Sequence, residues 1–292
     1  MVYCRLAREL NTAGSDLASA WHWPGGCTLG PAMFDRYETI RILEADPDLG
    51  EGLGPAALAR AETELLARVG TVDTGPWQPE EALPAPGDHL GVLVIEGLMT
   101  RNVVLAETSC AELVGRGDLL HPWDDLRAGA PVVADVEWTV LEPTTVALLD
   151  AGVLRVAAQW PVIVSNLLLR AVGRSQALAL ALAISCLTGL EVRLLTLLWH
   201  LADRWGRVGP TGVSVPLPLT HQILARLVGA SRPSVSTAMK ALETQGSISK
   251  RPGGGWLLHG EPPELVQAMR DRRTVALDAR RARRPERVGE AG

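Results

Sequence analysis

Several kinds of residue are scarce in this chain of 292 residues, and each scarcity excludes a class of protein. The four cysteines, Cys4, Cys27, Cys110 and Cys186, lie far apart, so they lack the spacing of a zinc finger, an iron–sulfur cluster or a redox pair. Reduced thiols of a cytoplasmic protein are therefore expected. No metal site is predicted, and no cofactor is expected.

Long uncharged apolar runs are also missing. The longest one near the apolar peak covers residues 175–190, and its 16 residues include polar ones. A membrane-spanning helix needs about 20 predominantly apolar residues. The N-terminus shows no basic segment followed by an apolar run, so no secretory signal is predicted. We therefore expect no membrane partner.

Basic residues are unevenly distributed along the chain. Residues 1–206 carry 14 basic and 26 acidic side chains, whereas residues 207–292 carry 14 basic and only 7 acidic ones. An acidic body joined to a basic end favours a polyanionic partner for that end. Charge alone fits a solvated tail without a partner equally well, so the sequence motifs must decide between the two.

The spacing of apolar runs and turn residues predicts an α+β protein with five regions. These are an irregular N-terminal extension (1–34), a β-rich domain (35–160), a helical segment (161–206), a domain of short helices and strands (207–262) and a basic tail (263–292). Within the β-rich domain we expect a helix at 55–69 and strands at 90–95, 103–105, 111–114, 132–136, 138–141 and 146–149, with Gly97 ending the first strand. Many short strands separated by turns favour a β-barrel or a sandwich.

The helical segment begins at Pro161, a residue suited to the first turn of a helix. Residues 162–173 are amphipathic, whereas residues 177–187 are apolar nearly all round. A helix that is apolar on every side is expected to be buried on every side. We therefore expect it to pack against its own β-rich domain and against a second subunit, and a further helix to follow at 191–205.

Residues 220–244 have the signals of two helices joined by a tight turn. Thr220 is a good N-cap for a helix at 221–228, Gly229 allows the left-handed conformation that ends it, and Ser231 caps the next helix. In that second helix one face is apolar and the opposite face is polar. The apolar face carries Val235, Met239 and Leu242, and the polar face carries Pro233, Thr237, Lys240 and Thr244, flanked by Ser236. This is the pattern of a helix-turn-helix.

Two short apolar segments follow, around Ile248 and at 256–258, and enclose a basic, glycine-rich tip with Lys250 and Arg251. Such a hairpin is typical of a wing that lies along DNA phosphates. Residues 220–258 as a whole resemble the winged helix-turn-helix of the Crp/Fnr family, the cyclic-AMP receptor protein type of bacterial transcription regulator. The segment LVGASRPSV at 227–235 is very close to that family's turn and to the start of its recognition helix.

The resemblance implies a fold, partners and contacts. The fold would be an N-terminal β-barrel of the jelly-roll, cyclic-nucleotide-binding-like type, a long dimerisation helix and the C-terminal winged helix-turn-helix. The protein would be a regulator and not an enzyme, forming a homodimer mainly through residues 161–187. Its partner would be double-stranded DNA with a palindromic operator, and RNA polymerase is a further candidate partner. Each recognition helix would enter a major groove, with half-sites about one helical turn apart.

Individual residues follow from the same resemblance. Arg232 matches the family arginine that reads a guanine, and Ser231 and Ser234 match positions near phosphates. Pro233 and Thr237 replace a glutamate and a second basic reader, so a half-site that contains a G but differs from the best-known consensus is expected. The candidate DNA contacts are Thr220, His221, Ser231, Arg232, Ser234, Ser236, Thr237, Lys240, Lys250 and Arg251.

The β-rich domain departs from the family's cyclic-AMP pocket. Residues 117–120 resemble the lead-in to that pocket, but the continuation from His121 lacks its Gly-Glu pair. Asp135 and Glu137 stand near the place of the Arg-Ser pair that holds the cyclic phosphate, and they would repel it. Control by cyclic AMP is therefore not expected. The effector is an unknown small molecule, or there is none.

Two other functions remain open from the sequence. The winged helix could serve protein contacts or assembly without reading DNA. The β-rich domain could also be a cupin-like, metal-dependent enzyme that uses His89, His121 and the acidic pair Asp124 and Asp125. The enzyme hypothesis lacks the closely spaced histidines of such sites and leaves the winged helix unexplained. His200 is expected to be a packed or hydrogen-bonded helix residue and not a catalyst.

Overall fold

The computed structural model describes residues 38–83, 89–122 and 134–263, all within one compact unit, Met33–Gly292. Three predicted features lie outside the described residues. These are the N-terminal extension, the basic tail and the acidic loop with Asp124 and Asp125.

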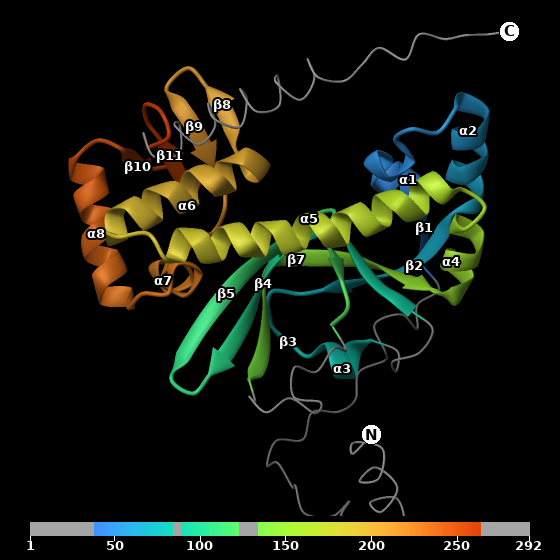
Figure 1. Cartoon of the computed structure of the whole chain (residues 1–292), viewed down its shortest axis with the longest axis horizontal. Helices are drawn as coiled ribbons and strands as arrows, with labels where there is room; N and C mark the ends of the chain where they lie inside the picture. Colours follow the sequence, from blue (N-terminus) through green and yellow to red (C-terminus); the bar gives the residue numbers. More distant parts are fainter. Residues whose placement is uncertain (1–37, 84–88, 123–133, 264–292) are drawn as a thin grey trace, which may run out of the picture. The chain divides into compact units, whose positions relative to one another are not determined.

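The N-terminal part of the described chain is rich in strands (Figure 1). Its elements are β1 (Thr39–Arg41), α1 (Ile42–Ala45), the 3-10 helix η2 (Pro47–Gly50), α2 (Pro55–Glu64), β2 (Leu66–Val72), β3 (Gly75–Trp77), α3 (Pro79–Ala82), β4 (His89–Leu105), β5 (Thr108–Gly115), β6 (Leu119–Leu120), β7 (Asp135–Asp150) and α4 (Ala151–Ala157).

These strands form one antiparallel sheet, and it is open. The pairing order is β1-β2-β7-β4-β5, with β3 also paired to β7 and β6 to β4. Among the described strands, β1 and β5 each pair with one neighbour, and no ladder joins them. The expected closed barrel is therefore not found. The edge strand β5 packs against the helix α7 of the C-terminal part instead of a further strand.

The sequence predicts that Gly97 ends a strand, but Gly97 lies within β4. The pairing of β4 with β7 shifts register on both sides of it, which marks a β-bulge. Gly97 has φ +101°, and an added Cβ would lie 2.5 Å from the Pro143 carbonyl oxygen. Glycine is needed here because the strand bends while the neighbouring backbone comes close.

Two other element predictions were wrong in their extent. The helix expected at 55–69 ends at Glu64, because the next residues pair as strand β2 with β1 and β7. The separate strands expected at 138–141 and 146–149 are parts of one strand, β7, which also includes Asp135 and Val136 from the strand expected at 132–136. Long-range pairing decides both outcomes, and a single segment does not reveal it.

A helix of 25 residues, α5 (Pro161–Ser185), follows α4 and runs past the sheet (Figure 1). The two helical segments expected from the sequence are one continuous helix. Two of its arginines join it to the N-terminal part. Arg170 donates to both carboxylate oxygens of Asp46, at 2.9 and 3.1 Å, and Arg174 donates to both oxygens of Glu112, at 2.6 and 2.8 Å.

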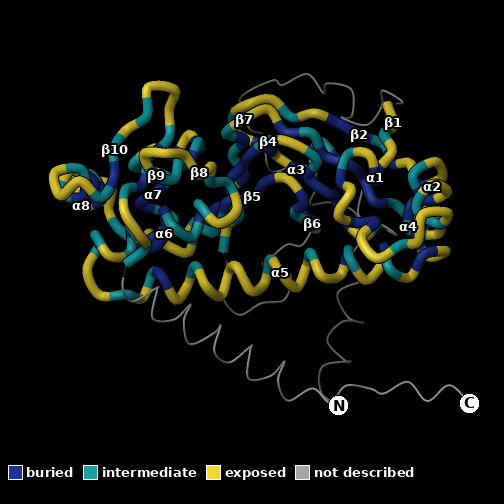
Figure 2. Tube along the Cα trace, turned by 90° about the horizontal axis from the view of Figure 1, so that it is seen from above, coloured by how far each residue is buried: buried dark blue, intermediate teal, exposed yellow. Residues whose placement is uncertain are grey.

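The single chain buries only part of residues 177–187, so their expected burial by a second subunit stays a prediction. Ile184 is buried, whereas Leu182 is 67% exposed, and much of α5 is coloured as exposed in Figure 2. Among the described helices, α5 alone is long and apolar enough to cross a membrane by length and composition. The ion pairs of Arg170 and Arg174 with the N-terminal part instead hold this helix against the sheet.

The C-terminal part combines three helices with a small sheet. Its elements are α6 (Leu190–Trp205), β8 (Arg207–Gly209), β9 (Gly212–Val215), α7 (His221–Val228), α8 (Arg232–Thr244), β10 (Ile248–Lys250) and β11 (Trp256–Leu258). The strands pair in the order β10-β11-β9-β8, and the hairpin β8–β9 was missed from the sequence.

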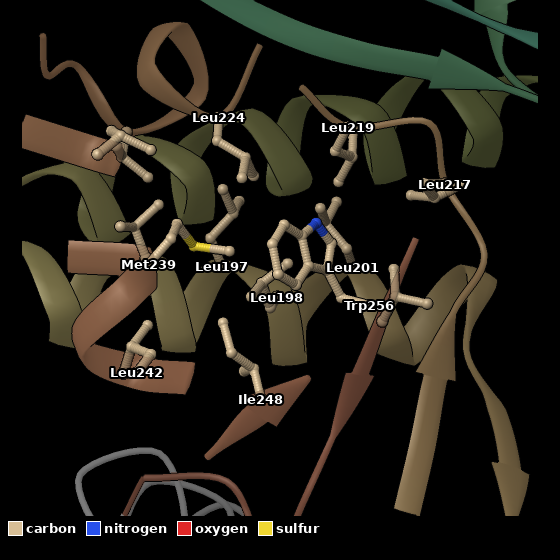
Figure 3. Close-up of a cluster of buried hydrophobic side chains, with 14 of the residues drawn as sticks. Leu197, Leu198, Leu201, Leu217, Leu219, Leu224, Met239, Leu242, Ile248 and Trp256 are labelled. Atoms are coloured by element: carbon tan, nitrogen blue, oxygen red, sulfur yellow. The ribbon is translucent and has the colours of Figure 1, made fainter. Parts of the chain in front are cut away.

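One buried apolar cluster holds this part together (Figure 3). Its residues come from α6, α7, α8 and the small sheet, and Met239 and Trp256 lie among leucines in its centre. Leu98 and Leu113 of the large sheet belong to the same cluster. The C-terminal helices therefore share a continuous core with β4 and β5.

Candidate DNA-binding site

The two helices α7 and α8 begin and end as their capping residues require. The Thr220 hydroxyl oxygen accepts a hydrogen bond from Ile223 N at 3.2 Å, and the Ser231 hydroxyl oxygen accepts one from Ser234 N at 3.3 Å. Gly229 lies between them with φ +63° and ψ +47°, the left-handed conformation that favours glycine. The predicted helix-turn-helix is therefore present, with its turn at the expected residues.

The apolar face of α8 fixes which side chains it presents outward. Val235, Ala238, Met239 and Leu242 are buried in the shared core. The opposite side is exposed from the first turn to the last. Its exposed residues are Ser231, Arg232, Pro233, Ser234, Thr237, Lys240 and Thr244. Seven of the ten candidate contacts lie on this surface or on the wing that follows it in sequence, namely Ser231, Arg232, Ser234, Thr237, Lys240, Lys250 and Arg251, and Thr220 is exposed at the start of α7.

Ser236 and His221 lie elsewhere, between the helices. His221 Nδ1 is 2.9 Å from the Ser236 hydroxyl oxygen, and that hydroxyl donates to the Arg232 carbonyl at 3.0 Å. The imidazole also stacks on Trp256 of β11, with ring centres 6.2 Å apart. These contacts join α7, α8 and the wing, so they position the recognition surface. Sequence spacing alone gave no sign of this role.

The strands β10 and β11 form the predicted wing. Arg251 N donates to the Gly255 carbonyl at 3.2 Å across its tip, and Gly255 has φ +78°. The Lys250 ammonium lies 5.7 Å from the centre of the Trp256 ring, a cation–π contact between the two strands of the wing. Lys250 is exposed, and Arg251 is partly exposed.

The missed hairpin β8–β9 supports this wing. Strand β9 pairs with β11, and β8 pairs with β9. The His259 side chain links β10 to the turn between β8 and β9. Its Nε2 atom is 2.8 Å from the Ser249 hydroxyl oxygen, and its Nδ1 atom is 3.2 Å from the Thr211 carbonyl oxygen. The signal for the hairpin was the turn at residues 210–212 between two short valine-containing segments.

Positive charge on this surface is available to a partner. Among the described residues, no carboxylate pairs with Arg232, Lys240, Lys250 or Arg251. The neighbouring Arg226 on α7 differs, because its guanidinium lies 4.0 Å from the Glu137 carboxylate of β7. The surface thus offers unpaired cations and hydroxyls in one place, which is the chemistry that phosphates and base edges accept.

A comparison with known families identifies this part of the chain. The family model described as a Crp-like helix-turn-helix domain matches residues 192–266. The C-terminal part is thus similar to a Crp-like helix-turn-helix domain. The resemblance to Crp/Fnr transcription regulators, expected from residues 220–258, is confirmed by this match. Crp/Fnr regulators bind DNA and act as dimers.

Solved structures show the same arrangement around the Crp-like domain. A double mutant of CooA from Carboxydothermus hydrogenoformans matches with a TM-score of 0.54 at 16% identity, over 73% of this chain and 90% of that chain. FixK2 from Bradyrhizobium japonicum matches with a TM-score of 0.50 at 15% identity, over 69% of this chain and 96% of that chain. Both show the fold, a sheet-rich N-terminal domain followed by the Crp-like domain. The search of curated proteins gives no match.

The residues considered for other sites are spread over the N-terminal part. His89 begins β4, and Asp135 begins β7. His121 follows β6, whereas the acidic residues expected beside it lie outside the described residues. Within the described ranges, no group of three or more His, Cys, Asp or Glu side chains could hold a metal ion. The geometry around the Crp-like domain is therefore the best-defined candidate site.

Proposed function

We propose that this chain is a sequence-specific DNA-binding transcription regulator of the Crp/Fnr type that acts as a homodimer on a palindromic operator. The observation that carries the proposal is the exposed outer face of α8, with Arg232 at its N-terminal end and without a carboxylate partner among the described residues. The N-terminal residues of a recognition helix are those that meet base edges in the major groove.

Each candidate contact has a role in this proposal. Arg232 reads a guanine, because its guanidinium can donate to O6 and N7 together. Lys240, Lys250 and Arg251 bind phosphates, which position the protein without specifying the sequence. Hydroxyls at the helix starts lie near phosphates, and these are Thr220, Ser231 and Ser234. The Ser231 and Ser234 hydroxyl oxygens are 2.8 Å apart, so one of this pair donates to the other and the second donates to a phosphate. Thr237 faces the groove, whereas His221 and Ser236 hold the two helices in place.

The homodimer would form along α5. Exposed apolar or small residues recur there with alternating steps of three and four, the repeat of a coiled-coil seam. The repeat consists of Val164, Leu168, Ala171, Ser175, Leu178 and Leu182. Leu168 and Leu182 are 65% and 67% exposed in the single chain. Burying such side chains in a second copy stabilises a dimer by roughly 25 cal/mol per Å² of apolar surface.

Each segment of the chain has its own role in this dimer. Residues 35–160 are the sensor domain, 161–206 the dimerisation and connecting helices, and 207–262 the DNA-binding domain. The sensor domain biases the placement of the two DNA-binding domains, and a ligand does this only through different affinities for the two placements. We propose that cyclic AMP does not control this protein and that it is not an enzyme.

The test is selection of bound fragments from a fragmented genome by the purified full chain, without added effector. The expected result is an enriched palindrome that contains a G in each half-site. Arg232→Ala should abolish the preference at that G, at a cost of roughly 1–3 kcal/mol per half-site. Arg60→Ala is the matched control, because Arg60 is exposed on α2 in the N-terminal part and makes only an i,i+4 pair with Glu64.

The outcome separates the proposal from its alternative. A palindrome that Arg232→Ala loses and Arg60→Ala keeps supports operator reading. A folded, dimeric protein without any salt-dependent DNA affinity would favour a winged helix used for protein contacts, since phosphate contacts impose a steep dependence on salt. Binding to all fragments alike would contradict sequence-specific reading and leave only backbone contacts.

A further inference from the structure

A cavity of about 330 Å³ lies between the N-terminal part and the C-terminal helices. Its walls come from β5 and the turn after it, from the middle of α5 and from α6, and Leu227 of α7 closes one side. The volume is at the lower end of the range of small-molecule sites, roughly 300–1,000 Å³. None of the residues assigned to the DNA-binding surface lines it.

One wall of the cavity is polar and rich in arginine. Arg204 donates to the Asp118 carboxylate at 3.0 Å and to the Arg116 carbonyl at 2.7 Å. Arg174 is held by Glu112 through two hydrogen bonds. Arg116 differs from both, because its guanidinium donates to the Ala45 carbonyl at 2.7 Å and pairs with no carboxylate among the described residues. The charge of Arg116 also acts on the Asp46 carboxylate, which already accepts from Arg170. The cavity lining contains four arginines and two carboxylates, so this wall carries a net positive charge that suits an anion.

The other walls are apolar. Leucine side chains from α5 and α6 and the ring of Trp205 line them, together with two alanines of α5. The leucines are Leu169, Leu178, Leu197 and Leu201. His200 also lines the cavity, and burial lowers its pKa, so its imidazole is neutral near pH 7 and can donate one hydrogen bond and accept another. Mainly apolar walls with a few polar or charged groups are the usual composition of a small-molecule site, and arginine among them suits a carboxylate.

We propose that this cavity binds a small organic carboxylate, with the anionic group against Arg116 and Arg204 and the apolar body between α5 and α6. Arginine suits the anionic group because its planar donors match the two carboxylate oxygens. The leucines shield the apolar part of the ligand from water, and this burial of apolar surface favours binding.

The site remains accessible in the proposed dimer. Of the six residues of the heptad seam on α5, only Leu178 lines the cavity. The other α5 residues of the cavity, such as Gly173 and Ala177, lie on a different side of the helix. A second copy that packs along the seam would therefore leave the polar wall uncovered.

An occupant would touch both parts of the regulator, which makes it an effector of the proposed function. It would contact the sheet through β5 and the DNA-binding part through α6 and Leu227. If the carboxylate competes with Asp118 for Arg204, it weakens a link between α6 and the turn after β5. Binding to the cavity and its effect on DNA are separate measurements, and only the second rests on the proposed function.

The test is titration calorimetry of the full chain with octanoate as the probe. Two control ligands separate the contributions: acetate has the carboxylate without the alkyl chain, and octanol has the alkyl chain without the carboxylate. We expect octanoate to bind at least about tenfold more tightly than either. Arg116→Gln should weaken octanoate binding by about tenfold and leave octanol unchanged.

A matched pair of variants at Gly173 locates the ligand. This glycine lines the cavity, and an added Cβ would meet no atom within 4 Å. Gly173→Leu should fill the space and abolish binding, whereas Gly173→Ala should bind octanoate like the unchanged protein. Ala177→Met is a second filling variant, should Gly173→Leu alter the helix. Circular dichroism verifies that each variant is folded.

Each outcome decides the proposal. Absent octanoate binding overturns it, and so does binding that survives both filling variants or that octanol matches. Octanoate binding without an effect on operator affinity overturns only the effector role. Failure to bind any operator, with calorimetry unchanged, would count against the proposed function and leave the cavity as a ligand site.

Discussion

The Nδ1 atom of His221 lies 2.9 Å from the hydroxyl oxygen of Ser236 and joins the first residue of α7 to the middle of α8. The Ser236 hydroxyl already donates to the Arg232 carbonyl, so it accepts from the His221 N–H. The same imidazole stacks on Trp256 of the wing. One histidine thus connects the three elements that would face DNA.

Ser236→Ala and its neighbour Thr237→Ala should separate positioning from contact. Ser236→Ala removes a part-buried hydrogen bond and should lower the free energy of unfolding by about 1 kcal/mol. Thr237 is exposed and its hydroxyl bonds only the Pro233 carbonyl, so Thr237→Ala should change stability by less than about 0.5 kcal/mol. We expect Thr237→Ala, and not Ser236→Ala, to alter the preference among operator sequences.

Urea denaturation and DNA titration of both variants provide the two measurements. Equal losses of stability would show that the His221–Ser236 contact contributes nothing to the fold. A change of sequence preference in Ser236→Ala alone would return Ser236 to the contact surface.

Lys250 beside the tip of the wing should bind a phosphate and not a base. Its ammonium is exposed and lies over Trp256. Lys250→Gln should weaken binding to all DNA sequences alike and reduce the slope of log K against log salt by about 1 for each phosphate that the variant no longer neutralises. The measurement is operator affinity over a salt series, with Arg60→Gln as the control. An unchanged slope would place the wing away from the phosphates.

The helix-turn-helix could be predicted from the sequence because its signals are local. The caps Thr220 and Ser231 and the left-handed Gly229 act on residues next to them in the chain. The exposed positions of Arg232 and Lys240 then follow from helical spacing. The function of Ser236 could not be predicted in this way, since it depends on His221, fifteen residues earlier, after the helices have packed.

The sheet was predicted less well because its extent depends on partners far away in sequence. Leu66 was expected in the last turns of a helix, but it begins strand β2 because it pairs with Arg41 of β1. Gly97 was expected to end a strand, but the pairing of β4 with β7 continues beyond it. The cavity also escaped prediction, because its arginines come from three separate elements.

Leu168→Glu should prevent dimer formation. Leu168 is 65% exposed in the single chain and lies in the heptad seam, so a charge there meets its own copy across the two-fold axis. We expect a monomer that remains folded and loses operator affinity. Sedimentation velocity gives the mass. Val208→Glu is the control, because Val208 is 87% exposed on β8 and lies outside α5. A dimeric Leu168→Glu would contradict this interface.

The two glycines at 97 and 173 should respond oppositely to alanine. Gly97→Ala places a Cβ against Pro143 and Thr144 at a positive φ, and we expect a loss of stability above about 1 kcal/mol. Gly173→Ala lies in a helix with open space around the new methyl group, so a gain of up to about 1 kcal/mol is expected. Thermal denaturation measures the change in stability of each variant. If both changes have the same sign, the need for glycine at the β-bulge is contradicted.

His200 should make stability depend on pH in the acid range. Burial lowers its pKa, Asp203 opposes the shift and Arg204 adds to it. Between the lowered pKa and the ordinary value of about 6.5, the unfolded chain binds a proton that the folded chain does not. The stability of the protein therefore falls as the pH falls through this interval.

His200→Gln removes the titrating group, so the stability of this variant relative to the unchanged protein should rise below pH about 6.5. Urea denaturation of both proteins above and below that pH measures the difference. A difference that stays constant with pH would mean that His200 titrates as freely in the folded chain as in the unfolded one.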